Sequence, residues 1–205
     1  MSKDPLYTHY SMLLQGFSFV SSGRFKEAEP LLRKVVSYSN EYGAEIIGTP
    51  AQALLGIVTL ASGNIRDGVR ILQEVIAISK ANERQYVAAI FEYILGKVYL
   101  EMSIERKIER VRLSVRNVVF LLSNFLRASK KAENYFTDAM DLANQIGAKL
   151  LAGQIGADLG LFYHRTGKEE KAKAYIIESI KLLERCGTNA YLEEAKRMYQ
   201  SIAIK

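Results

Sequence analysis

Few residues of this sequence have the types and spacing that catalysis or metal binding requires. The chain of 205 residues holds two histidines, His9 and His164, and a single cysteine, Cys186. A catalytic triad needs a serine and an acid beside a histidine, and the spacing of the sequence places neither next to His164. Cys186 falls near the end of an expected helix, where the helix dipole disfavours a thiolate. We therefore interpret both side chains as packed or solvated, and we expect no enzyme activity, no metal and no cofactor.

Acidic pairs and tyrosines also have structural interpretations. Glu169 and Glu170 open an expected helix, where carboxylates complement the positive end of the helix dipole. Twelve tyrosines are enough to suggest base stacking on nucleic acid. Tyr99 and Tyr163, however, occupy repeated packing positions, so we expect them in the core.

Composition excludes several classes of protein. Hydrophobic residues make up 49% of the chain and charged residues 24%, which is ordinary for a soluble folded domain. No apolar run approaches the roughly 18 residues of a membrane span, and the N-terminus lacks a basic start followed by an apolar core. One cysteine fits a reducing compartment. We expect a cytoplasmic protein that does not enter a membrane.

Positive charge is concentrated in one segment. The net charge is +6, yet residues 104–131 hold eight basic and two acidic residues, and the rest of the chain is balanced. Global charge is therefore a poor basis for inferring nucleic-acid binding, which we consider unlikely. The arginines that the segment offers to an acidic partner are Arg106, Arg110, Arg112 and Arg116.

An internal repeat organises the chain. Three series of small residues recur at intervals of 40 or 64, and they are Gly16, Gly56, Gly96, Gly160; Gly23, Gly63, Ser103, Gly167; and Ala28, Gly68, Ala132, Ala172. The first two series contain the long interval between their third and fourth members, and the third series contains it one step earlier. The long interval exceeds the short one by 24, and one insert of that length after Ser103 and before Ala132 explains both observations. The repeat therefore has a period of 40 and four copies.

Apolar residues three and four apart predict two helices in each copy. The copies cover about 9–48, 49–88, 89–152 and 153–187, with the insert inside 104–128 and a cap at 188–205. The expected helices are 7–20 and 25–38, 50–62 and 65–79, 84–102 and 130–145, 149–165 and 169–185, and a last helix over 189–202. Thr49-Pro50 is interpreted as a cap followed by the first helical residue, with a kink at Pro50 as the alternative. We expect one domain over 1–205.

Glycine in the interior of a helix costs roughly 1 kcal/mol relative to alanine. Four glycines at the same register (Gly16, Gly56, Gly96, Gly160) therefore need a reason. We infer that a side chain at these positions would hold the two helices of each pair apart, and that the third series of small residues faces them from the second helix.

These residues resemble the tetratricopeptide repeat, whose pattern places a Leu-Gly before a tyrosine and, later, an alanine followed by a phenylalanine on the same helix face. Copy three has Leu95-Gly96, Tyr99, Ala132 and Phe136, and copy four has Leu159-Gly160, Tyr163, Ala172 and Ile176. The large residue of the family is replaced by Met12, Gln52, Glu92 and Gly156. The resemblance implies an all-α, right-handed superhelix of antiparallel helix pairs, with one inserted helix and a C-terminal capping helix. HEAT-like repeats are the alternative.

A narrower resemblance rests on the order of several short runs. These are Ala128 to Phe136, Ile146 to Lys149, Asp158 to Gly160, Lys171-Ala172, Cys186-Gly187 and Tyr191 to Lys196. The order resembles the C-terminal repeat region of large bacterial proteins that join a cyclase or kinase-like module to an AAA-type ATPase. That resemblance implies a regulatory part of a larger protein, whose catalytic modules lie outside this chain.

The first helix of each pair is expected to line a concave groove. We assign the groove to Leu13, Phe17, Ala53, Ile57, Tyr93, Lys97, Leu100, Ala157, Leu161 and His164. Its first copies are apolar, which suits an amphipathic helix of a partner protein and excludes a charged clamp for a C-terminal carboxylate. The function we predict is a non-enzymatic protein-interaction module. A small-ligand sensor is the alternative, favoured if Tyr93, Lys97, Asp158 and His164 enclose a polar pocket, and RNA binding through the insert is a weaker one.

The insert has its own apolar stripe, formed by Ile108, Val111, Val115, Val118, Leu122 and Phe125. Such a stripe has to be covered, and we favour packing within the same chain over a homodimer. Because no proline or glycine interrupts residues 97–145, helix breaks are expected at Ser103, Ser123-Asn124 or Ser129.

Overall fold

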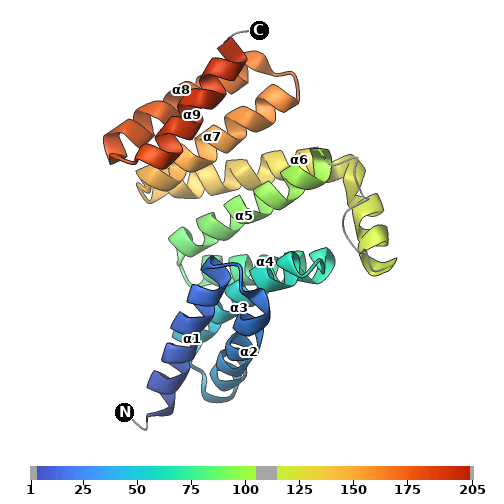
Figure 1. The fold of residues 1–205 in the computed structure, drawn as a ribbon, viewed down its shortest axis with the longest axis vertical. Helices are drawn as coiled ribbons and strands as arrows, with labels where there is room; N and C mark the ends of the chain where they lie inside the picture. The colour runs from blue at the N-terminus through green and yellow to red at the C-terminus, as the bar shows by residue number, and fades with distance from the viewer. Residues whose placement is uncertain (1–3, 105–114, 204–205) are drawn as a thin grey trace. The chain divides into compact units, whose positions relative to one another are not determined.

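The computed structural model describes residues 4–104 and 115–203 (Figure 1). These residues form helices joined by short turns and contain no strand. The helices are α1 (Pro5–Ser21), α2 (Phe25–Tyr42), α3 (Glu45–Ala61), α4 (Ile65–Ala81), α5 (Gln85–Ile104), α6 (Val115–Gln145), α7 (Lys149–Arg165), α8 (Glu169–Cys186) and α9 (Asn189–Ala203).

The four predicted copies correspond to the helix pairs α1–α2, α3–α4, α5–α6 and α7–α8, and α9 follows the last pair. Sequence signals explain the ends of several helices. Asp4 caps α1 by accepting a hydrogen bond of 2.8 Å from the backbone N–H of Leu6, and Pro5 occupies the first helical position. Gly43 and Gly187 end α2 and α8 in the left-handed conformation, with φ of 68° and 67°.

The interpretation of Thr49-Pro50 as a helix start is wrong. Helix α3 begins at Glu45, and Pro50 lies inside it. Proline lacks a backbone N–H, so the interior of α3 misses one hydrogen bond. Pro30 lies at the same sixth position of α2.

Helix α6 extends into the predicted insert. Helix α5 contains Ser103 and is described as far as Ile104. Helix α6 begins at Val115 and continues to Gln145, so it passes Ser123-Asn124 and Ser129 without ending. Those two expected breaks are not found, because serine and asparagine only weakly disfavour a helix interior.

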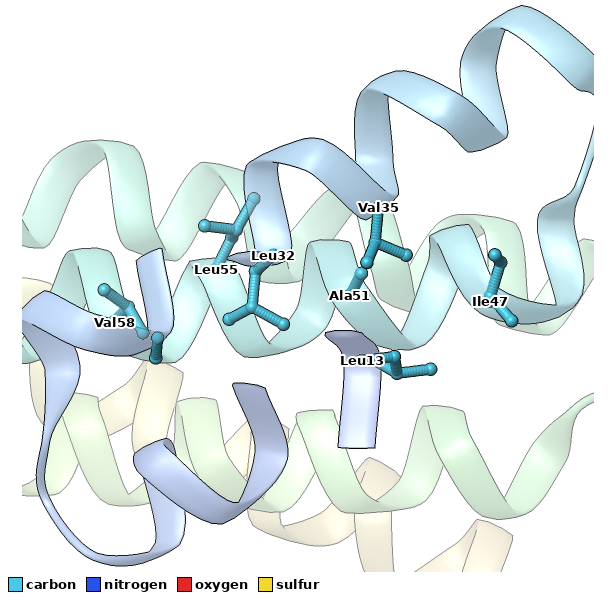
Figure 2. Close-up of a cluster of buried hydrophobic side chains, with 8 residues drawn as sticks. Leu13, Leu32, Val35, Ile47, Ala51, Leu55 and Val58 are labelled. Atoms are coloured by element: carbon cyan, nitrogen blue, oxygen red, sulfur yellow. The ribbon is translucent and has the colours of Figure 1, made fainter. Parts of the chain in front are cut away.

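The helices gather in two compact units. The first contains α1 to α4, and its core lies between α1, α2 and α3 (Figure 2). The second contains α5, α6 from Asn124 onward, α7, α8 and α9. The last helix closes this unit as predicted for a cap, since Ala195 of α9 is buried against Ala157 and Leu183.

Each of the four helix pairs shows the close approach predicted at its glycine, but the nearest side chain is a large one and does not belong to the third series of small residues, as the sequence analysis expected. A Cβ atom built on Gly16 would lie 2.6 Å from the Leu32 side chain, and one on Gly56 would lie 2.7 Å from Leu72. The partners are Phe136 for Gly96, at 2.7 Å, and Ile176 for Gly160, at a still shorter distance. The sequence numbers of the glycine and its partner differ by 16 in three copies and by 40 in the third. The excess in the third copy equals the length of the predicted insert.

None of the helices in the described residues is both long enough and apolar enough to cross a membrane.

Candidate binding surfaces

The predicted groove residues divide according to their position relative to the glycine of each pair. The residues that stand three positions before the glycine are all buried, and they are Leu13, Ala53 and Ala157. The residues directly after the glycine are more accessible: Phe17 is 58% exposed, and Ile57 and Leu161 are half-buried. Helical periodicity explains the division, because a residue three positions away shares the buried face of the glycine, whereas the next residue is turned by about 100°. Accessible surface is therefore found at the positions that follow the glycines.

Residues four positions after the glycine return to the buried face. Leu100 is 4% exposed. The side chain of His164 is 20% exposed, and its Nδ1 lies 2.9 Å from Oε2 and 3.0 Å from Oε1 of Glu169. This contact joins the end of α7 to the start of α8. The location agrees with the interpretation of His164 as a packed side chain.

Tyr93, Lys97 and Asp158 are brought together between α5 and α7. The Tyr93 hydroxyl donates a hydrogen bond of 2.6 Å to Oδ2 of Asp158, and Lys97 Nζ lies 3.3 Å from the same oxygen. Burial, together with the Asp158 carboxylate, raises the pKa of the Tyr93 phenol above its ordinary value of 10.0. The side chain of Lys97 is 54% exposed, so its ion pair contributes little to stability.

The cavity beside this polar group is small. Its volume is about 50 Å³, and Tyr191 and Glu194 of α9 also line it. Pockets for small organic ligands usually measure about 300–1,000 Å³, whereas one water molecule occupies about 30 Å³ in the liquid. His164 does not line this cavity. The polar group therefore ties α5 to α7 and does not enclose an effector.

A second polar tie joins α6 to α7. The buried Tyr163 donates a hydrogen bond of 3.0 Å to Oε1 of Glu133, and Lys168 Nζ lies 3.5 Å from the same oxygen. The Tyr163 ring also stacks on Tyr175, with centroids 5.4 Å apart. The prediction that Tyr163 packs in the core is confirmed, and so is that for Tyr99, which is 1% exposed.

Sequence reasoning missed the full extent of these tyrosine clusters. Tyr99 stacks on Tyr135 with centroids 5.4 Å apart, and Lys131 Nζ lies 5.0 Å from the Tyr99 centroid. Tyr163 has the same surroundings, with Lys171 Nζ 5.2 Å from its centroid. Once the length of the insert is subtracted, the lysine follows the tyrosine by eight positions in both copies. That shared offset was the signal in the sequence.

Helix α1 carries a row of exposed apolar side chains. Four large side chains spaced three, four and three residues apart are 63, 49, 53 and 58% exposed, and they are Tyr7, Tyr10, Leu14 and Phe17. We call these four residues the α1 stripe. Helix α1 contains no aspartate, glutamate, lysine or arginine. The adjoining face of α1 carries the buried Leu13 and Gly16, and Gly16 packs against Leu32 of α2.

The arginines of the basic segment are not placed on any surface. Arg106, Arg110 and Arg112 lie outside the described residues, and Arg116 lies in the first turn of α6 with its side chain outside them. The side chains of the insert's apolar stripe also lie outside the described residues, so the place where the stripe docks stays a prediction.

Metal-binding clusters are not found in the described part of the chain, where no three or more His, Cys, Asp or Glu side chains gather. Cys186 is partly exposed at the last position of α8. Its location is the helix end that the sequence predicted.

No family model matches the sequence, and no curated protein matches it. The fold is similar to the crystal structure of BtubC (BKLC) from P. vanneervenii, with a TM-score of 0.68 and 14% sequence identity. The match covers 97% of this chain and 74% of that one. At this identity the likeness shows the fold alone. The predicted all-α helical-repeat fold is confirmed, and a helical-repeat neighbour is compatible with the tetratricopeptide resemblance.

Proposed function

We propose that this chain is a non-enzymatic interaction module that binds an amphipathic helix of a partner protein through the α1 stripe. The observation that carries the proposal is the contiguous exposure of four large apolar side chains on a helix without formal charge. Single exposed apolar residues are common, but a row at helical spacing is typical of an interface. The spacing matches the apolar face of another helix.

Lack of charge on α1 defines the kind of partner. The stripe offers no ion pair, so recognition depends on buried apolar area, and the partner helix has to present aromatic or aliphatic residues at matching intervals. Charges at the edge of such an interface set orientation and contribute little affinity. The proposed setting is the regulatory repeat region of a larger bacterial signalling protein, and it rests on the order of short runs from Ala128 to Lys196.

The test is selection from a displayed library of amphipathic helical peptides on the purified chain, followed by calorimetry. The double variant Leu14→Lys, Phe17→Lys should weaken binding of the selected peptides by at least about tenfold, because two charges enter the apolar contact. Its melting temperature should stay within a few degrees of wild type, since both side chains are exposed.

Ile177→Lys is the control, because Ile177 of α8 is also an exposed apolar residue and the substitution also adds a positive charge. It should leave peptide binding unchanged. Selected peptides that bind the double variant and wild type equally would place the interface elsewhere. A library that yields no binder would contradict the proposal, and a dimer that the double variant turns into a monomer would identify the partner as a second copy.

A further inference from the structure

A trough lies between α6 and α8, with α7 as its floor. Its volume is about 510 Å³. The floor is buried, whereas Asp141 on one wall and Glu178 on the other are exposed, so the trough is open to solvent. This surface belongs to the second unit and is separate from the α1 stripe.

Gly156 explains why the trough is hollow. It stands at the register where the other copies carry Met12, Gln52 and Glu92, all of which are larger. A Cβ atom on Gly156 would lie 3.3 Å from Cβ of Ser179 and 3.6 Å from Cε of Met140. A longer side chain at this position would therefore enter the space between α6 and α8. The fourth copy lacks the side chain that fills the equivalent register in the others.

The lining combines apolar and acidic groups. Met140, Gly156 and Leu182 provide an apolar surface, and Tyr175 adds an aromatic ring. Asp141 and Glu178 supply the only formal charges of the lining, and both are negative. Within the described residues Asp141 has no ion-pair partner, and Glu178 pairs at 3.3 Å with Lys181, whose side chain is 57% exposed. Such an exposed pair is weak and exchanges readily.

We propose that this trough binds an arginine side chain of a partner polypeptide. Its aliphatic stem covers the apolar floor, and its guanidinium lies between the carboxylates of Asp141 and Glu178 and beside the Tyr175 ring. Arginine fits because its planar group binds carboxylates with two parallel hydrogen bonds and also stacks on aromatic rings. The charge of the walls excludes an acidic occupant.

A polypeptide fits the shape better than a free small molecule. Small-molecule pockets usually bury most of their ligand, and this trough has exposed rims. Its α8 wall extends from Ala174 to Leu182, which corresponds to about 12 Å of helix. That length accommodates one long side chain and the residue next to it.

Titration of the ¹⁵N-labelled full chain with acetyl-Leu-Arg-Leu-amide, monitored by NMR, tests the proposal. The probe should shift the amide signals of Gly156 and Ser179 at millimolar concentration. The matched peptide with citrulline in place of arginine has nearly the same shape and no charge. It should bind at least about tenfold more weakly, because the charge-assisted hydrogen bonds are lost.

Variants locate the carboxylates that act. The double variant Asp141→Asn, Glu178→Gln should weaken binding of the arginine peptide about as much as citrulline does. Asp138→Asn is the matched control, since Asp138 is an exposed carboxylate of α6 outside the lining, and it should have no effect. The Leu14→Lys, Phe17→Lys variant should also bind normally, which separates this trough from the α1 stripe.

Three results would overturn the proposal. One is the absence of shifts at Gly156 with millimolar arginine peptide, and another is equal binding of the citrulline peptide. The third is acetyl-arginine-amide binding as tightly as the tripeptide, which would show that the trough takes a free organic cation and not a polypeptide segment.

Discussion

The first two helix pairs and the last two use the same packing contact but different chemistry beside it. In α1–α2 and α3–α4, the glycine meets a leucine, Leu32 or Leu72. In α5–α6 and α7–α8 it meets Phe136 or Ile176. The identity of the large residue varies, whereas the absence of a side chain opposite it does not. The close approach of the two helices is therefore the element that all four pairs share.

The first two and the last two helix pairs differ in the residue that stands three positions after the glycine. Copies one and two have Phe19, below the Arg24 guanidinium, and Thr59, whose hydroxyl donates to the Leu55 carbonyl. Copies three and four have Tyr99 and Tyr163, each stacked on a second tyrosine and beside a lysine. The glycine thus sets the helix spacing, whereas the neighbouring register is free to carry polar ties between helices.

The largest effect is expected from substituting the glycines themselves. Gly160→Leu should destabilise the chain by about 3 kcal/mol or more, and Gly16→Leu by about 1–3 kcal/mol. The Cβ of residue 160 would meet Ile176 and also the Ala172 backbone oxygen at 3.1 Å, whereas the three atoms nearest to that of residue 16 all belong to the flexible Leu32 side chain. A β-branched isoleucine in a helix has one preferred rotamer and yields less than leucine. Urea denaturation measures the free energy of unfolding of the two glycine variants.

Gln15→Leu is the control, because residue 15 is exposed and the added side chain is the same. It should leave the free energy of unfolding within about 0.5 kcal/mol of wild type. If both glycine variants were as stable as this control, close packing would not be the reason for the glycines, and the two regions would lose their common element.

The sequence was sufficient to predict the helix pairs and the close approach at each glycine, because small residues recur at fixed intervals. It did not predict that the glycines would meet large side chains, since it paired them with the third series of small residues. It misplaced the start of α3, since Pro50 is tolerated inside a helix at the cost of one hydrogen bond. It also assigned Leu13 and Ala157 to a groove although they are buried. A helix in an array packs on neighbours from two sides, and a single sequence does not show the second side. The sequence showed that Gly156 replaces a larger residue of the repeat, but it did not show the trough, because the trough also depends on how far apart α6 and α8 lie.

Turns between copies provide a second comparison of the two regions. Gly43, Gly147 and Gly187 have φ of 67–69°, and Glu83 stands at the same register with φ of 55°. A non-glycine residue in the left-handed conformation destabilises the folded chain by about 1 kcal/mol or more. Replacing it with glycine removes this strain, but glycine has greater conformational freedom in the unfolded chain, which offsets part of the stabilisation. Glu83→Gly should therefore stabilise the chain by up to about 1 kcal/mol.

Thermal denaturation should show this as an increase of roughly 2–4 °C in melting temperature. Gly187→Ala is the converse substitution and should lower the melting temperature by a similar amount, since it places a Cβ on left-handed backbone. A Glu83→Gly variant less stable than wild type would show that the glutamate side chain contributes more than its backbone costs.

The smallest effect is expected at the tyrosine cluster of the third copy. Burial, with Tyr135 beside it, raises the pKa of Tyr99 from 10.0 to about 12. The folded chain thus holds the phenol proton more tightly than the unfolded chain, so stability is complete below pH 10 and falls as the pH rises from 10 to 12. Tyr99→Phe should cost less than about 1 kcal/mol at neutral pH, because the hydrogen bond it removes, from Lys131, is long at 3.4 Å. Above pH 10 the variant should lose stability less steeply than wild type in urea denaturation. Tyr7→Phe, at an exposed position of α1, should follow the wild-type slope. Equal slopes for Tyr99→Phe and wild type would mean that the buried phenol of copy three does not titrate as part of folding, and the chemical difference between the two regions would then be one of packing only.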